Sequence, residues 1–117
     1  MGQGVLTDSR FADAGLSRDG GALHLGGVAL SAIAEQVGTP VYVYNAEAIR
    51  QRYRCLDAAL AGVPHRICYA VKANSTLAVL RILRDLGAGA DIVSAGEMSR
   101  ALAAGFAPER TSSPQAR

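Results

Sequence analysis

The chain has 117 residues, half of them hydrophobic, which suits one small domain with its own core. Its net charge of +2 comes from dispersed basic residues, so no nucleic-acid partner is expected, because such a partner needs a clustered basic patch. No stretch approaches the roughly 20 apolar residues of a membrane span, and the first residues lack the pattern of a signal peptide, so no membrane partner is expected either.

The first third of the chain predicts a loose arm and one helix. Residues 1–25 read as an N-terminal arm with short extended pieces that glycine pairs interrupt. Residues 29–37 place apolar side chains at helical spacing, and Gly38 is a candidate for the residue that ends this helix. A β-rich run of valine and tyrosine then follows at residues 41–44.

From residue 41 onward, with the run at 41–44 as the first strand, the patterns of strands and helices alternate. Asn45 is a candidate N-cap for the first of these helices, and Asn74 or Ser75 is a candidate for the second. The expected elements are a helix over 46–62, a strand over 66–71, a helix over 76–86, a strand over 90–93 and a helix over 95–104. This rhythm is typical of parallel strands joined by helical crossovers, and it predicts an α/β fold.

Lys72 is the only lysine in a chain with eleven arginines, and it follows the apolar run 66–71. Arginine is always protonated and cannot form an imine, whereas a lysine amine can once its pKa is lowered. Ligands of parallel α/β folds bind beyond the carboxyl ends of the strands, where this lysine is expected. Lys72 is therefore a candidate for amine chemistry. The alternative is that arginine-rich codon usage left one lysine by chance.

Two acidic residues follow Lys72 by one strand–helix–strand step. Asp91 belongs to the next expected strand, so it should reach the same rim as Lys72, where a carboxylate can hold or orient an amine. Its alternative role is that of a solvated acid at a strand end. Glu97 is explained equally well by a capping box with Ser94, in which the serine caps a helix and the glutamate lies three residues later.

The remaining candidate ligands predict neither a metal site nor a disulfide. His24 and His65 are isolated and read as ordinary surface or loop histidines, because a metal site needs more ligands at closer spacing. Cys55 and Cys68 do not form a Cys-x-x-Cys pair, and they fit the reduced thiols of a cytoplasmic protein.

Three segments of the chain resemble the diaminopimelate decarboxylases when they are taken in order. They are Thr-Pro-Val-Tyr-Val-Tyr at 39–44, Tyr-Ala-Val-Lys-Ala-Asn at 69–74 and Gly-Ala-Asp-Ile-Val-Ser-Ala-Gly-Glu at 89–97. This family belongs to the fold-type III enzymes of pyridoxal 5′-phosphate (PLP), with ornithine and arginine decarboxylases and alanine racemase. The resemblance runs from about residue 20 to Arg110. It implies the first part of an alanine-racemase-like (β/α)₈ barrel, incomplete here because such a barrel takes roughly 250 residues.

The resemblance also implies a function for the parent enzyme. That enzyme is expected to be a homodimeric, PLP-dependent carboxy-lyase that converts a small amino-acid substrate, meso-2,6-diaminopimelate, to L-lysine in lysine biosynthesis. Lys72 matches the lysine that binds PLP as a Schiff base. Asp91 matches an acidic residue beside the cofactor, and Glu97 matches another with a weaker correspondence. No metal is implied.

Three alternatives to this function stay open. The parent could be an ornithine- or arginine-type decarboxylase. It could also be another fold-type III enzyme, such as a PLP-carrier protein or an alanine racemase, although residues 91–97 fit the racemases poorly. In a different class, the chain could be a non-catalytic remnant. Because the glycine-rich phosphate loop and later elements of the family are absent, we expect the chain alone to be inactive, with five core side chains lacking most of their partners: Leu77, Leu80, Leu83, Ile92 and Val93.

The predicted organisation is an arm over 1–25, a partial PLP-binding barrel over 26–110 and a tail over 111–117 that departs from the family. The tail is polar and carries no strand signal. The family typically continues after residue 110 with a sequence such as Ile-Val-Phe-Ser-Gly. Deletion of one base from a coding of that sequence gives the Thr-Ser-Ser-Pro found at 111–114, so the tail is expected to arise from a frameshift.

Overall fold

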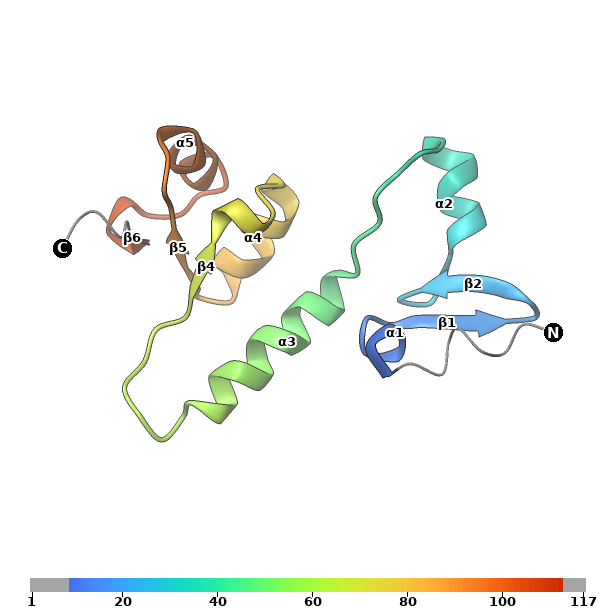
Figure 1. The fold of residues 1–117 in the computed structure, drawn as a ribbon, viewed down its shortest axis with the longest axis horizontal. Helices are drawn as coiled ribbons and strands as arrows, with labels where there is room; N and C mark the ends of the chain where they lie inside the picture. The colour runs from blue at the N-terminus through green and yellow to red at the C-terminus, as the bar shows by residue number, and fades with distance from the viewer. Residues whose placement is uncertain (1–8, 113–117) are drawn as a thin grey trace. The chain divides into compact units, whose positions relative to one another are not determined.

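The computed structural model describes residues 9–112 of the chain (Figure 1). Two compact units are present, residues 1–48 and residues 49–117, and the division falls inside helix α3 (Ala46–Ala59). The sequence predicts a boundary after residue 25, so the first unit extends well beyond the expected arm. Residues 1–8 of that arm lie outside the described part of the chain.

The first unit contains a three-stranded antiparallel sheet whose strands follow chain order. Its elements are α1 (Ser9–Asp13), β1 (Leu16–Asp19), β2 (Ala22–Leu25), β3 (Val28–Ala29) and α2 (Leu30–Val37). The turn between β1 and β2, which lie side by side in Figure 1, is made by Gly20 and Gly21 with φ of +54° and +86°. Two consecutive positive φ angles match the right-handed twist of a hairpin, and glycine adopts them without steric cost.

Helix α2 confirms the helix expected over 29–37, and Gly38 ends it by donating its backbone N–H to the Ala34 carbonyl oxygen over 2.8 Å. The β-rich run expected at 41–44 is wrong, because these residues are coil between α2 and α3. Tyr42 is 88% exposed. Strand propensity reflects packing on a pleated, half-buried surface, and no described strand pairs with this segment.

The second unit contains a parallel sheet in the order β4 (Cys68–Ala70), β5 (Gly89–Asp91), β6 (Thr111–Ser112). Helices α4 (Leu77–Asp85) and α5 (Ala95–Ala103) make the crossovers, with short 3₁₀ turns η1 (Val71–Ala73) and η2 (Pro108–Arg110). Tyr69 lies beside Ala90, and Ala90 lies beside Thr111. The parallel α/β arrangement expected from the alternating patterns is confirmed.

Strand β6 differs from the expectation that the tail carries no strand. Thr111 and Ser112 pair with Ala90 and Asp91, and the Ile92 backbone N–H donates to the Ser112 carbonyl oxygen over 2.9 Å. Main-chain groups form this ladder, so a polar sequence can complete it where a neighbouring strand already offers its edge. Residues 113–117 lie outside the described part of the chain.

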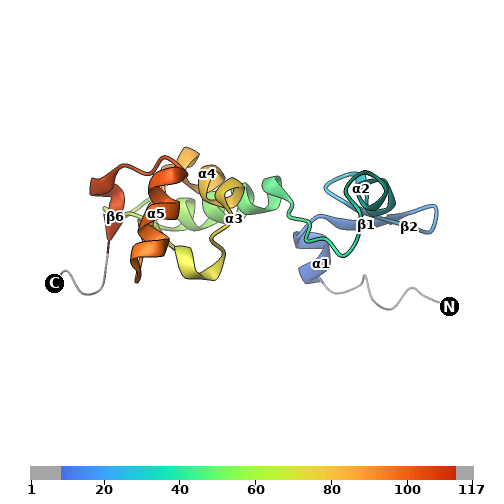
Figure 2. The same cartoon turned by 90° about the horizontal axis from the view of Figure 1, so that it is seen from above.

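Helices α4 and α5, which are labelled in Figure 2, pack against each other, and both contribute side chains to the core cluster that contains Ala90 and Ile92. The main core cluster consists of Val71, Leu80, Ala90, Ile92, Ala101, Ala104 and Phe106. A second cluster consists of Val79, Leu83 and Ala88, with Ile49, Tyr53 and Tyr69 packed against it.

The burial of these clusters corrects one expectation about the isolated chain. Leu80, Leu83 and Ile92 are only 0%, 7% and 6% exposed, so they do not lack partners. The two crossover helices bury them locally, without the rest of a barrel. Burial of each such side chain contributes about 1.5–3 kcal/mol. Val93, in contrast, is 53% exposed, as expected.

Candidate functional site

Lys72 lies where β4 ends, in the 3₁₀ turn η1. The residue before it, Val71, is fully buried and joins the main core cluster, so the start of the turn is anchored. Lys72 itself is exposed. Within residues 9–112 its ammonium has no hydrogen-bond or ion-pair partner, which leaves the amine accessible for reaction.

Asp91 is the last residue of β5 and lies opposite Ala70 in the parallel register. Strands β4 and β5 therefore end at the same edge of the sheet. Lys72 lies two residues after Ala70, the residue that pairs with Asp91. The two residues flanking Asp91, Ala90 and Ile92, are buried under the helices, so the half-buried Asp91 side chain leaves the sheet on the opposite face. No hydrogen bond or ion pair joins Lys72 to Asp91 in the described chain, so an interaction between them stays a prediction.

The expected capping pair of Ser94 and Glu97 is present at the start of α5. The Ser94 hydroxyl oxygen accepts a hydrogen bond from the Glu97 backbone N–H over 3.1 Å. Oε2 of Glu97 in turn accepts a hydrogen bond from the Val93 backbone N–H over 2.9 Å. In a standard capping box the donor would be the backbone N–H of the N-cap residue, Ser94. The capping role of Glu97 is confirmed, whereas a role beside a cofactor stays a prediction.

Two side chains hold the backbone of the turn that follows Lys72. The Tyr69 hydroxyl donates to the Asn74 carbonyl oxygen over 3.2 Å, and Nε of Arg100 donates to the Ser75 carbonyl oxygen over 2.7 Å. Tyr69 comes from β4 and Arg100 from α5. The segment between η1 and α4 is thus hydrogen-bonded to two different elements although it has no regular structure.

The cap of α4 differs from the expectation. The N-cap is Thr76, with no side-chain capping bond, rather than Asn74 or Ser75. Oδ1 of Asn74 accepts the Thr76 backbone N–H over 3.0 Å, which makes an Asx turn before the helix. Sequence reasoning also missed Arg100, because an arginine on an amphipathic helix carries no signal that its partner lies 25 residues earlier in the chain.

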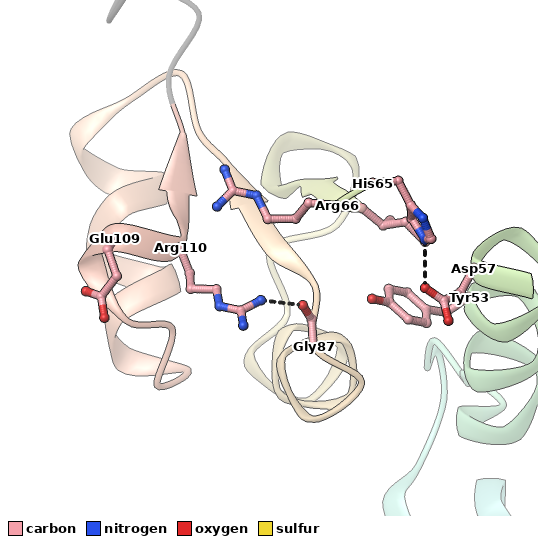
Figure 3. A pocket seen from close by; sticks show the side chains of 8 residues that line it. Tyr53, Asp57, His65, Arg66, Gly87, Glu109 and Arg110 are labelled. Atoms are coloured by element: carbon pink, nitrogen blue, oxygen red, sulfur yellow. Dashed lines mark hydrogen bonds and ion pairs between the residues drawn. The ribbon is translucent and has the colours of Figure 1, made fainter. Parts of the chain in front are cut away.

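A cavity of about 490 Å³ lies at the other end of the same strands (Figure 3). It is lined by Tyr53, Asp57, His65, Arg66, Ile67, Gly87, Glu109 and Arg110. Ile67 immediately precedes β4, Arg110 immediately precedes β6, and Gly87 lies two residues before β5, which places the cavity at the amino ends of these strands. Neither Lys72 nor Asp91 lines it.

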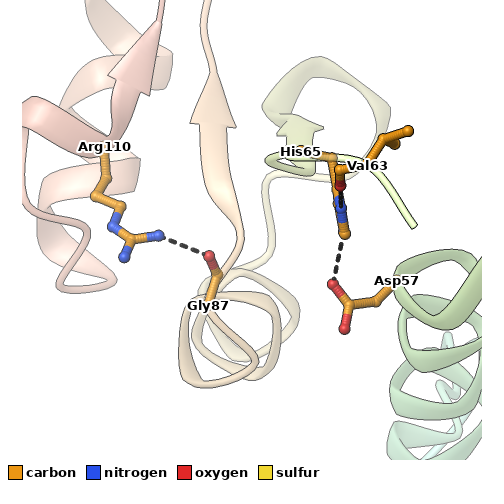
Figure 4. Close-up of polar contacts among 5 residues, drawn as sticks. All are labelled: Asp57, Val63, His65, Gly87 and Arg110. Atoms are coloured by element: carbon orange, nitrogen blue, oxygen red, sulfur yellow. Dashed lines mark hydrogen bonds and ion pairs between the residues drawn. The ribbon is translucent and has the colours of Figure 1, made fainter. Parts of the chain in front are cut away.

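Side chains pair with one another and with backbone at this cavity (Figure 4). Nε2 of His65 lies 3.0 Å from Oδ1 of Asp57, and its Nδ1 lies 2.9 Å from the Val63 carbonyl oxygen. Both ring nitrogens therefore face acceptors. The Val63 carbonyl first, and then the Asp57 carboxylate, raise the pKa of His65. Nη1 of Arg110 donates to the Gly87 carbonyl oxygen over 2.9 Å.

Burial of the Tyr53 ring, more than the nearby Asp57 charge, raises the pKa of its phenol.

The described residues contain no group of three His, Cys, Asp or Glu side chains arranged to hold a metal ion. Among residues 9–112, no helix has the length and apolar character needed to cross a membrane.

A family model described as "Pyridoxal-dependent decarboxylase, pyridoxal binding domain" matches residues 46–114. The match begins near the division between the two units and includes the whole parallel sheet. It extends four residues past Arg110, where the sequence predicts that the resemblance ends.

Curated proteins and a solved structure are similar to the chain. It is 57% identical over 91 residues to a diaminopimelate decarboxylase of Pseudomonas fluorescens, covering 78% of this chain and 22% of that protein. It is 60% identical over 84 residues to that of Pseudomonas aeruginosa, covering 72% and 20%. The crystal structure of diaminopimelate decarboxylase from M. jannaschii in co-complex with L-lysine matches with a TM-score of 0.80 and 31% identity, covering 86% and 25%. The chain thus spans about a fifth of the length of these two curated relatives.

Proposed function

Because the chain belongs to the pyridoxal-dependent decarboxylases, whose pyridoxal-binding domain it matches, we propose that it carries the cofactor lysine of a diaminopimelate decarboxylase. The proposed activity is decarboxylation of meso-2,6-diaminopimelate to L-lysine by the enzyme that contains these elements. The identity to two diaminopimelate decarboxylases supports this substrate over the ornithine- and arginine-type alternative. The L-lysine in the M. jannaschii complex supports a small amino-acid ligand.

The observation that carries the proposal is the state of Lys72. Its amine is exposed and without a partner among residues 9–112, at the carboxyl end of a parallel strand. Asp91 ends the neighbouring strand at the same edge. A lysine amine can form an imine with an aldehyde, so Lys72 fits the aldehyde cofactor PLP.

Each residue then has a separate task. Lys72 would hold the cofactor through its amine, and Asp91 would hold a proton at that amine or orient it. Glu97 would keep the start of α5 in place through Val93. When bound, PLP supplies an electron sink for the carbanion that remains after loss of CO₂. We further propose that the whole enzyme is a cytoplasmic homodimer.

Reductive trapping tests this proposal. The purified chain is incubated with PLP, reduced with borohydride, digested and mapped by mass spectrometry. Because Lys72 is the only lysine, the amino-terminal amine is the only competing primary amine and serves as an internal reference. We expect Lys72 to be labelled in preference to that amine in the folded chain, and to lose the preference in urea.

The control is Lys72→Arg, which keeps the charge but cannot form the covalent bond. It should leave label at the amino terminus alone. Equal labelling of Lys72 in folded and urea-unfolded chain would contradict the proposal, because the fold would then contribute nothing to the reaction of this lysine with the cofactor.

A further inference from the structure

The segment between η1 and α4, residues 74–76, has no helix or strand of its own and directly follows the turn that contains Lys72. A lysine that must meet a cofactor in one geometry needs a fixed backbone, because its side chain has four rotatable bonds. The contacts of residues 74–76 are therefore the place to look for residues that position Lys72.

Arg100 supplies one of these contacts from a rigid element. Its neighbour Ala101 is fully buried in the main core cluster, and Ala104, one turn later, is only 1% exposed. Helix α5 is thus fixed by packing while Arg100 remains at its surface. Nε of Arg100 donates to the Ser75 carbonyl oxygen over 2.7 Å, a hydrogen bond that the guanidinium charge strengthens.

Tyr69, from β4, supplies the second contact. Its ring packs against both hydrophobic clusters, and its hydroxyl donates to the Asn74 carbonyl oxygen over 3.2 Å. Asn74 then uses its own Oδ1 to accept the Thr76 backbone N–H. Successive carbonyls after the lysine turn are therefore taken by side chains from two different elements.

We propose that Arg100 is a positioning residue for Lys72, acting through the Ser75 carbonyl. The inference rests on the proposed function of Lys72 and extends it to a residue that touches neither the lysine nor the cofactor. Without Arg100 the exposed Ser75 carbonyl can bond to water, so the unit keeps its fold. The turn then samples more conformations, and the amine meets the cofactor less often in the productive one.

The test compares Arg100→Gln with Arg81→Gln in the complete chain. Arg81 lies on the exposed surface of α4 and has no hydrogen-bond or ion-pair partner among the described residues, so its variant controls for the loss of a positive charge. The first readout is PLP labelling of Lys72 relative to the amino-terminal amine after reduction. We expect Arg100→Gln to lower this ratio by about tenfold, the value of one charged hydrogen bond, and Arg81→Gln to leave it unchanged.

The second readout is hydrogen exchange of the Thr76 backbone amide, which reports on the turn without any cofactor. We expect faster exchange in Arg100→Gln, while buried amides such as that of Leu80 keep their protection. Tyr69→Phe, which removes only the hydroxyl, should act in the same direction with a smaller effect, since its bond is longer and uncharged.

The outcomes separate this inference from the proposed function. If unmodified chain shows no preference for labelling at Lys72, the proposed function fails. If it shows the preference and Arg100→Gln keeps both the labelling ratio and the Thr76 exchange rate, the positioning role is overturned. Uniform loss of protection throughout the second unit would also overturn it, because Arg100 would then be a structural residue.

Discussion

The two ends of the parallel sheet β4–β5–β6 differ in which groups form hydrogen bonds. At the carboxyl end, side chains of Tyr69 and Arg100 bond to backbone carbonyls, and Lys72 is without a partner among the described residues. At the amino end, side chains also pair with each other, as Asp57 does with His65, around a cavity of about 490 Å³.

This difference teaches that a cavity need not mark the site that we propose to be reactive. A reactive amine needs a fixed backbone and a side chain free of strong partners, and the carboxyl end provides both for Lys72. Parallel α/β folds place their chemistry at this end, while the opposite end serves stability. The predictions below disturb the two ends separately, from the largest expected effect to the smallest.

Replacing Lys72 should remove the chemistry of the carboxyl end completely. Neither Lys72→Ala nor Lys72→Arg can bond to PLP, so label at this position should disappear from the peptide map. Stability should change little, because Lys72 is exposed. Far-ultraviolet circular dichroism and urea unfolding check the second point. If PLP labelled another position of the Lys72→Arg chain in the folded state and not in urea, the assignment of Lys72 as the cofactor lysine would be contradicted.

Gly89→Ala should damage the sheet at its amino end, where Gly89 begins β5. A Cβ at Gly89 would lie 2.8 Å from Sγ of Cys68 and 3.0 Å from the Arg110 carbonyl oxygen. The thiol can rotate away but the backbone carbonyl cannot, so we expect a loss of about 1–3 kcal/mol in the free energy of unfolding. Urea unfolding measures it.

Gly62→Ala is the matched control, since nothing lies within 4 Å of its added Cβ. If the control and Gly89→Ala unfold at the same urea concentration, the close approach of β4, β5 and the segment before β6 does not constrain this position.

Asp91→Asn should weaken the chemistry at the carboxyl end without weakening the fold. The variant keeps the size of the side chain and removes its charge, so Lys72 loses the carboxylate that we expect to orient its amine. We expect several-fold lower labelling of Lys72 in the peptide map, with an unchanged midpoint of urea unfolding. Loss of stability with unchanged labelling would favour the alternative of a structural strand-end acid.

The amino end should respond to pH through His65. Its pKa is raised in the folded chain by the Val63 carbonyl and then by Asp57, above the unfolded value of about 6.5. A raised pKa stabilises the folded chain fully below the unfolded pKa, and this contribution is lost as the pH rises through the folded pKa. The melting temperature of the wild-type chain should therefore lie above that of His65→Gln. This difference should be larger at about pH 5.5 than at about pH 8.5.

The effect should be small, because this ion pair is exposed to solvent. His24→Gln, in the first unit, provides a histidine control. Labelling of Lys72 should be the same in His65→Gln as in the wild-type chain, since the two residues lie at opposite ends of the sheet. A loss of labelling in His65→Gln would show that the two ends are coupled.

The sequence predicts the parallel sheet and its crossovers because those elements depend on local patterns. Apolar spacing and the Ser94 cap are sufficient for α4 and α5, and the apolar runs are sufficient for β4 and β5. The run at 41–44 fails because a strand also requires a partner, which no local pattern reports. Thr111 and Ser112 are the opposite case. They lack a strand pattern, yet they form a strand because they pair with the edge of β5.

The candidate site is only partly readable from sequence for a similar reason. Lys72 stands out chemically, and the alternation places it at a rim with Asp91. The contact of Arg100 with Ser75 depends on how α5 packs beside the lysine turn, and that packing is a property of the assembled unit. The pairing of His65 with Asp57 likewise joins a loop to a helix, and sequence alone reads His65 as an ordinary surface residue.

The most direct test of the central claim uses the single lysine of the chain. A chain labelled with ¹³C at the lysine Cε gives one NMR signal, from Lys72, which can be followed while PLP is added. We expect a new signal from the covalently bound lysine in the folded chain at PLP concentrations that leave the urea-unfolded chain unmodified. An unchanged signal in the folded chain, or equal conversion in both states, would contradict the account.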